Sequence, residues 1–314
     1  MQFHLNYSPK PSDAKIDHQQ KIMLIGSCFA ENMGEYLHDH RFNTLLNPNG
    51  ILFNPISIYK ALINCIENKT MEDALILKRN DLFFSFLHHS SLFSQNKNEL
   101  SLQINAIQTK TNAFLKEADL LIITFGTAHV YKHKQLKNVV ANCHKQPATD
   151  FEKKLLYVEE IVSEYKSLIQ ALKKFNPKIK IIFTVSPVKY LKDGVEENNL
   201  SKATLLLAIN ELKKETNVSY FPAYELVNDD LRDYRFYKED LAHPNEQAIE
   251  YVWEKFADTY FTNETKQLNK EIASIVSSEK HTLLFPESEE AKLFTSNLEK
   301  KKRELKGRFP FLEI

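Results

Sequence analysis

Short apolar runs recur along the chain, and each one ends at a glycine or a polar residue. Residues 21–26 (KIMLIG), 119–126 (DLLIITFG) and 178–185 (KIKIIFTV) have the pattern of buried strands, and 218–222 is a weaker fourth run. The stretches between them have the pattern of helices. Near-continuous apolar strands that alternate with helices are typical of a parallel sheet covered on both faces. The pattern therefore predicts a three-layer α/β/α domain with a parallel central sheet.

Capping residues mark the ends of several predicted helices. Asn54 followed by Pro55 is a typical N-cap and first-turn pair for the segment ISIYKALINCIEN. Asp150 precedes an amphipathic segment that we expect to be helical as far as Phe175. A further helix is predicted at 245–260.

The C-terminal part of the chain differs from the rest in being highly charged. No glycine- or proline-rich linker precedes it. We therefore expect residues 1–262 to form the main domain and residues 263–314 a helical appendage packed on it. Its lysine-rich run is expected to be a solvated helix face.

Composition excludes several classes of function. The 41 basic and 41 acidic residues cancel, which argues against a nucleic-acid partner. The three cysteines are far apart, which argues against a disulfide framework, and no zinc-like spacing occurs. No segment has the length of a membrane span or the apolar core of a signal peptide. We expect a cytoplasmic protein that holds no metal and no cofactor.

Residues that can carry chemistry follow the predicted strands directly. Ligands of parallel sheets bind beyond the carboxyl ends of the strands, an edge that receives Gly26-Ser27-Cys28, Gly126-Thr127 and Ser186-Pro187. A thiol or hydroxyl on a strand-to-helix turn is well placed as a nucleophile, because the helix N-terminus stabilises negative charge. Small buried residues in a tight turn would give the same sequence.

Asp240 and His243 are a second candidate pair. At this spacing the carboxylate can orient the imidazole, whose other nitrogen is then free to accept a proton. A surface aspartate beside a histidine that caps the next helix is an equal alternative. Cys143 and His144 are expected to be structural or to line a substrate pocket, and residues 83–93 (FFSFLHHSSLF) to form a lid, a pocket wall or part of the core.

Six sequence blocks together resemble the GSCFA family. They lie between residues 26 and 245 and are GSCFAENMG, NPNGILFNPISI, FGTAHVY, VANCHKQP, TVSPV and LRDYRFYKEDLAHPN. Through this family the chain is also similar to the SGNH, or GDSL-type, hydrolases. That resemblance implies a flavodoxin-like α/β/α fold and a site built from serine, aspartate and histidine.

The resemblance transfers unevenly to individual residues. Aligning the Gly-Asp-Ser turn of SGNH proteins without a gap puts Cys28 at the nucleophile, whereas a shift of one residue puts Ser27 there. The closing Asp-x-x-His block matches Asp240 and His243. The Gly-x-Asn-Asp block falls on Gly126-Thr127-Ala128-His129, so that alanine replaces the asparagine that donates to the oxyanion.

Other groups are candidates for the missing donor. They are the backbone N–H groups of Cys28 and Gly50 and the side-chain amide of Asn142, while Gly126, Thr127 and His144 are further candidates for substrate binding. Together these features predict an ester hydrolase that acts on a small-molecule or glycan ester. An O-acyltransferase acting on a sugar or lipid hydroxyl and a non-catalytic binding module remain as alternatives.

Overall fold

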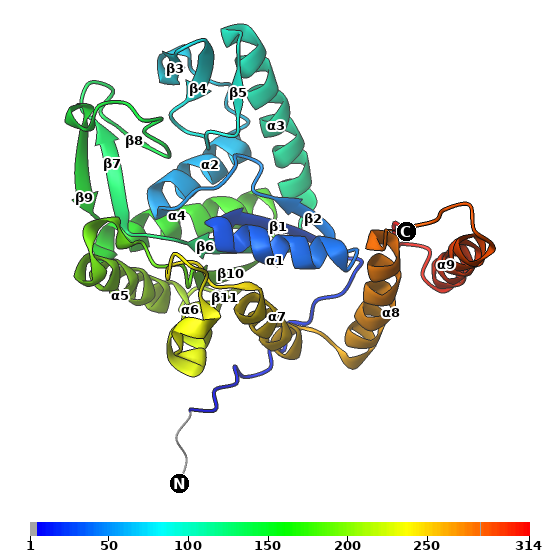
Figure 1. Ribbon diagram of the computed structural model, residues 1–314. Helices are drawn as coiled ribbons and strands as arrows, with labels where there is room; N and C mark the ends of the chain where they lie inside the picture. The colour runs from blue at the N-terminus through cyan, green and yellow to red at the C-terminus, as the bar shows by residue number, and fades with distance from the viewer. Residues whose placement is uncertain (1–4, 283) are drawn as a thin grey trace.

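Five parallel strands form the central sheet of the computed structural model, which describes residues 5–282 and 284–314 (Figure 1). They are β1 (Lys21–Gly26), β2 (Asn43–Leu46), β6 (Leu120–Phe125), β10 (Lys180–Val185) and β11 (Val218–Phe221). Their spatial order is β11-β10-β6-β1-β2, which is the flavodoxin-like order. The predicted fold class is therefore confirmed, and the topological switch point lies between β1 and β6.

Helices cover both faces of this sheet (Figure 1). They are α1 (Cys28–Asp39), α2 (Pro55–Glu67), α3 (Lys97–Glu117), α4 (Val158–Phe175), α5 (Val195–Leu212), α6 (Ala223–Glu225) and α7 (Glu246–Tyr260). One face packs against α2, α3, α4 and α5, and the opposite face packs against α1 and α7. The predicted N-cap is confirmed at Asn54, whose side chain accepts from the Ser57 N–H at 2.8 Å, and the helix predicted at 245–260 is present with Asn245 as its N-cap.

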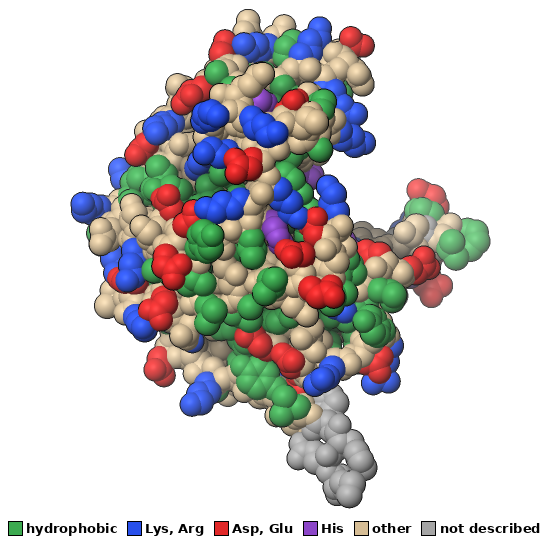
Figure 2. Space-filling view, turned by 90° about the vertical axis from the view of Figure 1, so that its left-hand side faces the viewer, with side chains coloured by type: hydrophobic (Ala, Val, Ile, Leu, Met, Phe, Trp, Pro, Cys, Tyr) green, Lys and Arg blue, Asp and Glu red, His purple; other side chains and the backbone are tan. Residues whose placement is uncertain are grey.

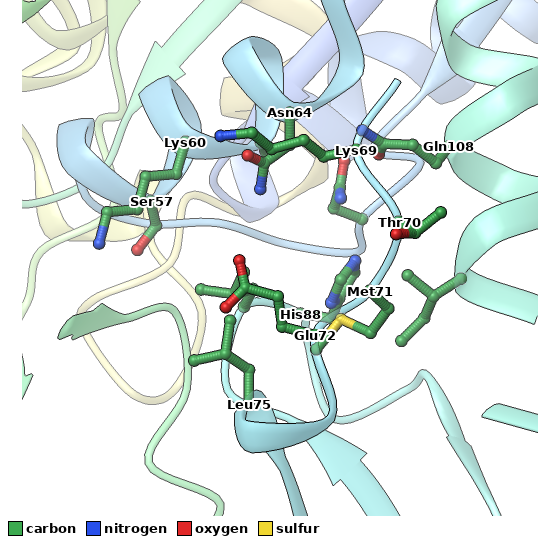
Figure 3. Close-up of a pocket in the computed structure, with 14 residues that line it drawn as sticks. Ser57, Lys60, Asn64, Lys69, Thr70, Met71, Glu72, Leu75, His88 and Gln108 are labelled. Carbon is green, nitrogen blue, oxygen red and sulfur yellow. The ribbon is translucent and has the colours of Figure 1, made fainter. Parts of the chain in front are cut away.

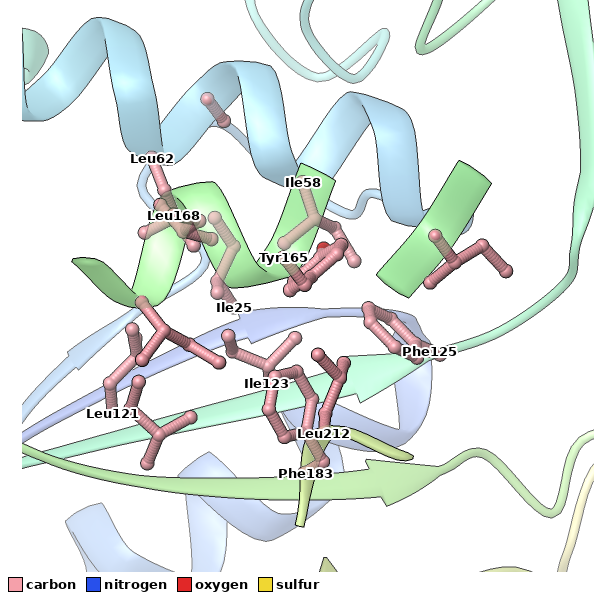
Figure 4. Packing of buried hydrophobic residues seen from close by; sticks show 14 of the residues in the cluster. Ile25, Ile58, Leu62, Leu121, Ile123, Phe125, Tyr165, Leu168, Phe183 and Leu212 are labelled. Atoms are coloured by element: carbon pink, nitrogen blue, oxygen red, sulfur yellow. The ribbon is translucent and has the colours of Figure 1, made fainter. Parts of the chain in front are cut away.

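Alternation along each strand divides the apolar side chains between two core clusters. In β1, Met23 and Ile25 belong to the cluster under α2–α5, whereas Ile22 and Leu24 face α1 and α7. Figure 4 shows the first cluster, in which Tyr165 lies between α2 and the strands near Phe125. Burial on both faces explains why these strands have continuous apolar sequences.

Two small antiparallel sheets lie beside the main sheet, and the sequence pattern did not predict them. One contains β3 (Ile76–Arg79), β4 (Leu82–Ser85) and β5 (Phe93–Ser94), and the other contains β7 (His129–His133), β8 (Asn138–Val140) and β9 (Phe151–Leu155). Phe86, Val140 and Phe151 form one apolar cluster that joins them. These additions stand on the side of the molecule that bears α2 (Figure 1).

The prediction of one helix from Asp150 to Phe175 was wrong in its first part. Residues 151–155 form β9, which pairs antiparallel with β7, and α4 begins only at Val158. Long-range pairing with β7 overrides the local charge pattern of this segment. The helix then starts where the Tyr157 N–H donates to Glu160 Oε2 at 2.8 Å.

Two helices follow the main domain, α8 (Asn263–Lys280) and α9 (Glu289–Arg308). Side chains of α8 form ion pairs with residues at and just beyond the end of α1, namely Lys280 with Asp39 and Glu279 with Arg41. A small apolar cluster joins α8 to α9 and the C-terminal residues. Within the described ranges, no helix combines the length and the apolar character needed to cross a membrane.

Candidate functional site

The turn between β1 and α1 is tight, and its first residue must be glycine. Gly26 has φ +143°, and a Cβ atom there would lie 2.2 Å from Thr124 O on the neighbouring strand. The same carbonyl accepts the Ser27 N–H at 3.1 Å. The turn is therefore fixed against β6 at the switch point.

Ser27 and Cys28 have different environments in this turn. Ser27 is only 1% exposed, and its hydroxyl has no hydrogen-bond partner among the described residues. Cys28 is half-buried, and burial and the nearby Glu31 raise the pKa of its thiol. Its own N–H and that of Phe29 at the start of α1 act in the opposite direction.

Asp240 and His243 form a hydrogen-bonded pair. The imidazole Nδ1 lies 2.6 Å from Asp240 Oδ2, and Asp240 Oδ1 accepts from the backbone N–H groups of Ala242 and His243 at 2.9 Å each. These hydrogen bonds, led by the His243 N–H, hold the pKa of Asp240 well below its usual range. The side chains are 48% and 46% exposed, so the pair is open to solvent.

Backbone contacts bring this pair to the carboxyl edge of the sheet. The Lys189 N–H, four residues after β10, donates to Ala242 O at 3.0 Å. Within the part of the chain that the structure describes, no hydrogen bond joins His243 to Ser27 or Cys28. The two halves of the predicted site thus share an edge of the sheet without a hydrogen bond between these side chains, and their catalytic roles stay predictions.

Most of the backbone donors suggested by the sequence are already engaged. The Gly50 N–H donates to Asn47 O at 2.7 Å, and the N–H groups of Gly126 and Thr127 both donate to Phe53 O, at 2.8 and 3.0 Å. The Cys28 N–H lies in the first turn of α1, where a helix supplies no backbone acceptor. Of these N–H groups, that of Cys28 is the best placed for an anion.

The Thr127 hydroxyl takes part in a separate network. It lies 3.0 Å from Ser201 Oγ on α5 and accepts the His129 N–H at 3.1 Å. Ser201 also accepts the Ala128 N–H at 2.7 Å. These contacts attach the end of β6 to α5.

Asn142 and His144 lie against the β3–β5 sheet. Asn142 Oδ1 accepts the His144 N–H at 2.8 Å, and His144 Nε2 lies 2.8 Å from Ser85 O. His144 is buried and stacks on Phe84, while Cys143 packs on the cluster around Phe86. No hydrogen bond among the described residues joins these side chains to the β1–α1 turn, and a role for Asn142 at the oxyanion stays a prediction.

Sequence reasoning missed two residues beside the turn, of which the first is Asn47. Its Oδ1 accepts the Gly26 N–H at 2.8 Å, which holds the amide against the turn. Its Nδ2 is buried and makes no hydrogen bond of good geometry among the described residues, although the Asn47 amide lies close enough to Glu31 to oppose the rise that burial causes in the pKa of that carboxyl. The signal available in the sequence was the position of Asn47 directly after an apolar run.

Lys202 is the second missed residue. It is 1% exposed, and its Nζ donates to Gly126 O and Ser186 O at 2.7 Å each. Burial lowers the pKa of Lys202 to about 7, although the charge of Cys28 acts in the opposite direction. The sequence did hold a signal for Lys202, because this lysine lies on the buried face of α5 together with Leu205.

The segment 83–93 contributes to the core, which was one of its predicted roles. Phe84 and Phe86 are buried in the core, whereas His89 lies over the turn after β2. A Cβ atom added to Gly50 would lie 2.4 Å from His89 Cβ, and the charge of His89 opposes the rise in the pKa of Glu31 that burial causes. Figure 2 shows the face toward which the strands run, where basic and acidic side chains are mixed and histidine is visible near the middle.

An enclosed cavity lies between α2, α3 and the segment around Met71 (Figure 3). His88 and Gln108 line it, and burial lowers the pKa of His88 to about 4. Its volume of about 40 Å³ has room for a few water molecules and is far below that of a typical ligand pocket. This cavity is therefore not a substrate site.

Comparison with solved structures found carbohydrate esterases. A family 3 enzyme from Talaromyces cellulolyticus is 12% identical with a TM-score of 0.37, over 80% of this chain and 99% of that chain. An acetyl xylan esterase from the rumen bacterium Butyrivibrio proteoclasticus is 13% identical with a TM-score of 0.38, over 77% and 63% of the two chains. A family two esterase from Clostridium thermocellum, solved with cellohexaose, is 11% identical with a TM-score of 0.35, over 80% and 64%.

Comparisons of sequence gave two results. Among curated proteins, none matches the chain. The model of the GSCFA family matches residues 21–256, and the chain therefore belongs to the GSCFA family.

Proposed function

We propose that the protein is an ester hydrolase that works by acyl transfer at the carboxyl edge of its sheet. The observation that carries the proposal is the 2.6 Å contact between His243 Nδ1 and Asp240 Oδ2. The carboxylate stays ionised at neutral pH because three hydrogen bonds stabilise its charge. It therefore fixes the tautomer that leaves His243 Nε2 free to accept a proton.

The reaction begins when the nucleophile, Cys28 or Ser27, attacks the ester carbonyl. His243 accepts the proton of the nucleophile and returns it to the leaving alcohol as the C–O bond breaks. Water then attacks the acyl-enzyme, with His243 again as the base. The Asp240–His243 pair is exposed and lies on a loop. We therefore propose that this loop brings His243 to the β1–α1 turn when the substrate binds.

Stabilisation of the oxyanion requires donors that are not already engaged. We assign this role to the Cys28 N–H and to one side-chain amide, either Asn47 or Asn142. Asn47 is favoured because its Nδ2 is buried beside Glu31 and makes no hydrogen bond of good geometry among the described residues. Loss of one oxyanion donor typically costs about 10² to 10³ in rate, so Asn47→Ala and Asn142→Ala distinguish the two assignments.

An open pocket that shares Lys189 with the contacts of the His243 loop supports a polar substrate, such as a small-molecule or glycan ester. It has a volume of about 340 Å³, and Lys189, Tyr234 and Tyr237 are among its lining residues. Lys189 Nζ lies 3.9 Å from the centre of the Tyr237 ring. The Lys189 N–H also donates to Ala242 O, so one residue of this pocket contacts the loop that carries His243.

Turnover of p-nitrophenyl acetate and butyrate tests the proposal. The wild type is compared with Cys28→Ala, Ser27→Ala and His243→Ala, and His281→Ala serves as the control because His281 is an exposed histidine at the end of α8. We expect turnover to be lost in His243→Ala and in one of the two turn variants only. Equal turnover in all five proteins would refute the assigned site.

Two other functions are outcomes of the same experiment. An acyl-enzyme that forms in the wild type but is released only by added sugar or alcohol would identify an O-acyltransferase. Absence of both turnover and acyl-enzyme would favour a non-catalytic binding module. The N–H groups of Gly50, Gly126 and Thr127 agree with this alternative, because they already donate to backbone carbonyls and are not free to stabilise an oxyanion.

A further inference from the structure

Phe53 is an exposed aromatic residue at the carboxyl edge of the sheet, and the proposed acyl transfer gives it no role. It is 39% exposed, and it belongs to none of the apolar clusters formed by the described residues. A single exposed phenylalanine is common on protein surfaces, so its exposure alone indicates nothing. The position of Phe53 is what distinguishes it.

Backbone hydrogen bonds fix this residue at the switch point of the sheet. Phe53 O accepts the N–H groups of Gly126 and Thr127, which follow β6, at 2.8 and 3.0 Å. The preceding residue, Leu52, donates its N–H to Gly26 O at the end of β1 at 2.9 Å. Residues 52 and 53 therefore connect the ends of the strands that flank the switch point, where ligands of such sheets bind.

The β1–α1 turn lies directly beside Phe53. A Cβ atom on Gly126 would lie 3.0 Å from Phe53 O, 3.4 Å from Phe53 Cα and 3.2 Å from Ser27 Cβ. Only a glycine therefore separates the backbone of Phe53 from Ser27, and Cys28 is the next residue of the turn. Because the Phe53 carbonyl is engaged by the N–H groups of Gly126 and Thr127, the exposed part of the residue is mainly its ring.

The leaving alcohol of the ester has a different place. His243, which returns the proton to the alcohol in the proposed reaction, precedes α7, whereas Phe53 precedes α2. These two helices lie on opposite faces of the sheet (Figure 1). The polar pocket that includes Lys189 and Tyr234 contacts the loop of His243 through the Lys189 N–H. An ester bound at the turn with its alcohol toward His243 thus has its acyl chain toward Phe53.

We propose that Phe53 is a specificity-determining residue, whose exposed side chain binds the acyl chain of the substrate and favours an apolar acyl group longer than acetyl. The physical cause is the transfer of methylene groups from water onto an apolar ring. This inference rests on the proposed function, because an acyl chain has a place here only if an ester binds at the turn.

The test compares kcat/KM for p-nitrophenyl butyrate with kcat/KM for p-nitrophenyl acetate, in the wild type and in Phe53→Ala. Each methylene that leaves water for an apolar surface contributes about fourfold, so we expect the butyrate-to-acetate ratio to fall about three- to tenfold in the variant. Phe53→Leu keeps an apolar side chain and should retain most of the ratio. Phe53→Gln keeps the length without the apolar character and should lose it, which covers the case in which Phe53→Ala does not fold. An unchanged ratio in Phe53→Ala or Phe53→Gln would overturn the inference.

Phe311→Ala is the matched control. Phe311 is 43% exposed, and it lines a pocket at the opposite, amino edge of the sheet together with His18, which precedes β1, and Asn43, which begins β2. Its butyrate-to-acetate ratio should equal that of the wild type. A fall of the same size in this control would show that loss of any exposed ring lowers the ratio, and it would also overturn the inference.

Binding measured without turnover separates this inference from the proposed function. In protein labelled with 4-fluorophenylalanine, the ¹⁹F resonance that is missing from Phe53→Leu is assigned to Phe53. We expect sodium butyrate, the salt of the acid product, to shift this resonance at lower concentrations than sodium acetate does. If the wild type turns over no ester while butyrate shifts the resonance, the proposed function fails and the apolar subsite stands. If esters are hydrolysed but neither the ratio nor the resonance responds to chain length, the inference fails and the proposed function stands.

Discussion

Replacement of Gly26 by alanine is expected to destabilise the protein severely. The added Cβ atom would lie 2.2 Å from Thr124 O and 2.9 Å from Thr124 C, and φ +143° is a conformation that alanine rarely adopts. The unusual dihedral costs about 1–3 kcal/mol, and displacement of the packed backbone costs about 1–3 kcal/mol more. Thr124 O cannot move freely because it also accepts the Ser27 N–H. Gly26→Ala should therefore lose about 2–6 kcal/mol, a large part of the roughly 5–15 kcal/mol that stabilises a typical domain.

Urea unfolding followed by circular dichroism measures this loss. Gly307→Ala is the matched control, because no atom lies within 4 Å of the position of its new Cβ and the residue belongs to helix α9. That control should be neutral or more stable by up to about 1 kcal/mol. A free energy of unfolding for Gly26→Ala within about 0.5 kcal/mol of the wild type would refute the steric argument.

Three further predictions follow from single contacts. Asn54→Ala removes the N-cap of α2 and should cost about 1–2 kcal/mol in urea unfolding, whereas a cost near zero would contradict the 2.8 Å hydrogen bond to Ser57 N. Burial lowers the pKa of His88 to about 4, so the stability that its neutral form contributes is complete above pH 6.5, the pKa in the unfolded chain, and is lost as the pH falls toward 4. His88→Gln should weaken this loss of stability in acid, and an unchanged pH profile of the free energy of unfolding would contradict the prediction. Asp240→Asn should lower ester turnover by about 10² to 10⁴ with an unchanged circular dichroism spectrum, because the amide can stabilise the wrong tautomer of His243; full turnover would exclude an orienting role for the carboxylate.

The main sheet was predictable because its signal is local. The strands β1, β6 and β10 are nearly continuous apolar runs, since both of their faces are buried. The N-caps at Asn54 and Asn245 were predictable for the same reason, as each depends on a side chain and a backbone N–H three residues later.

The small sheets were not predictable because their strands depend on distant partners. In β9, Phe151 is buried but Glu152, Lys153 and Lys154 are exposed, a pattern that suits a helix surface equally well. Pairing with β7 decides the conformation, and such pairing leaves little trace in the segment itself.

Asp240 and His243 could be paired from the sequence because only three positions separate them. Asn47 and Lys202 could not be assigned, since each reaches the turn through the fold: Asn47 through the pairing of β2 with β1, and Lys202 through the packing of α5 on the sheet. A buried lysine has no local motif, and only its occurrence in an apolar stripe distinguishes it from a surface residue.

The two halves of the candidate site are held in opposite ways, and this difference indicates which half moves. Gly26 and Lys202 fix the β1–α1 turn and the neighbouring strand ends by backbone contacts in a buried environment. Asp240 and His243 are about half exposed, and Leu241 between them has φ +55°, a strained value for leucine. Because the turn cannot shift without breaking the ladder between β1 and β6, we expect any closure of the proposed site on a substrate to come from the loop that carries His243.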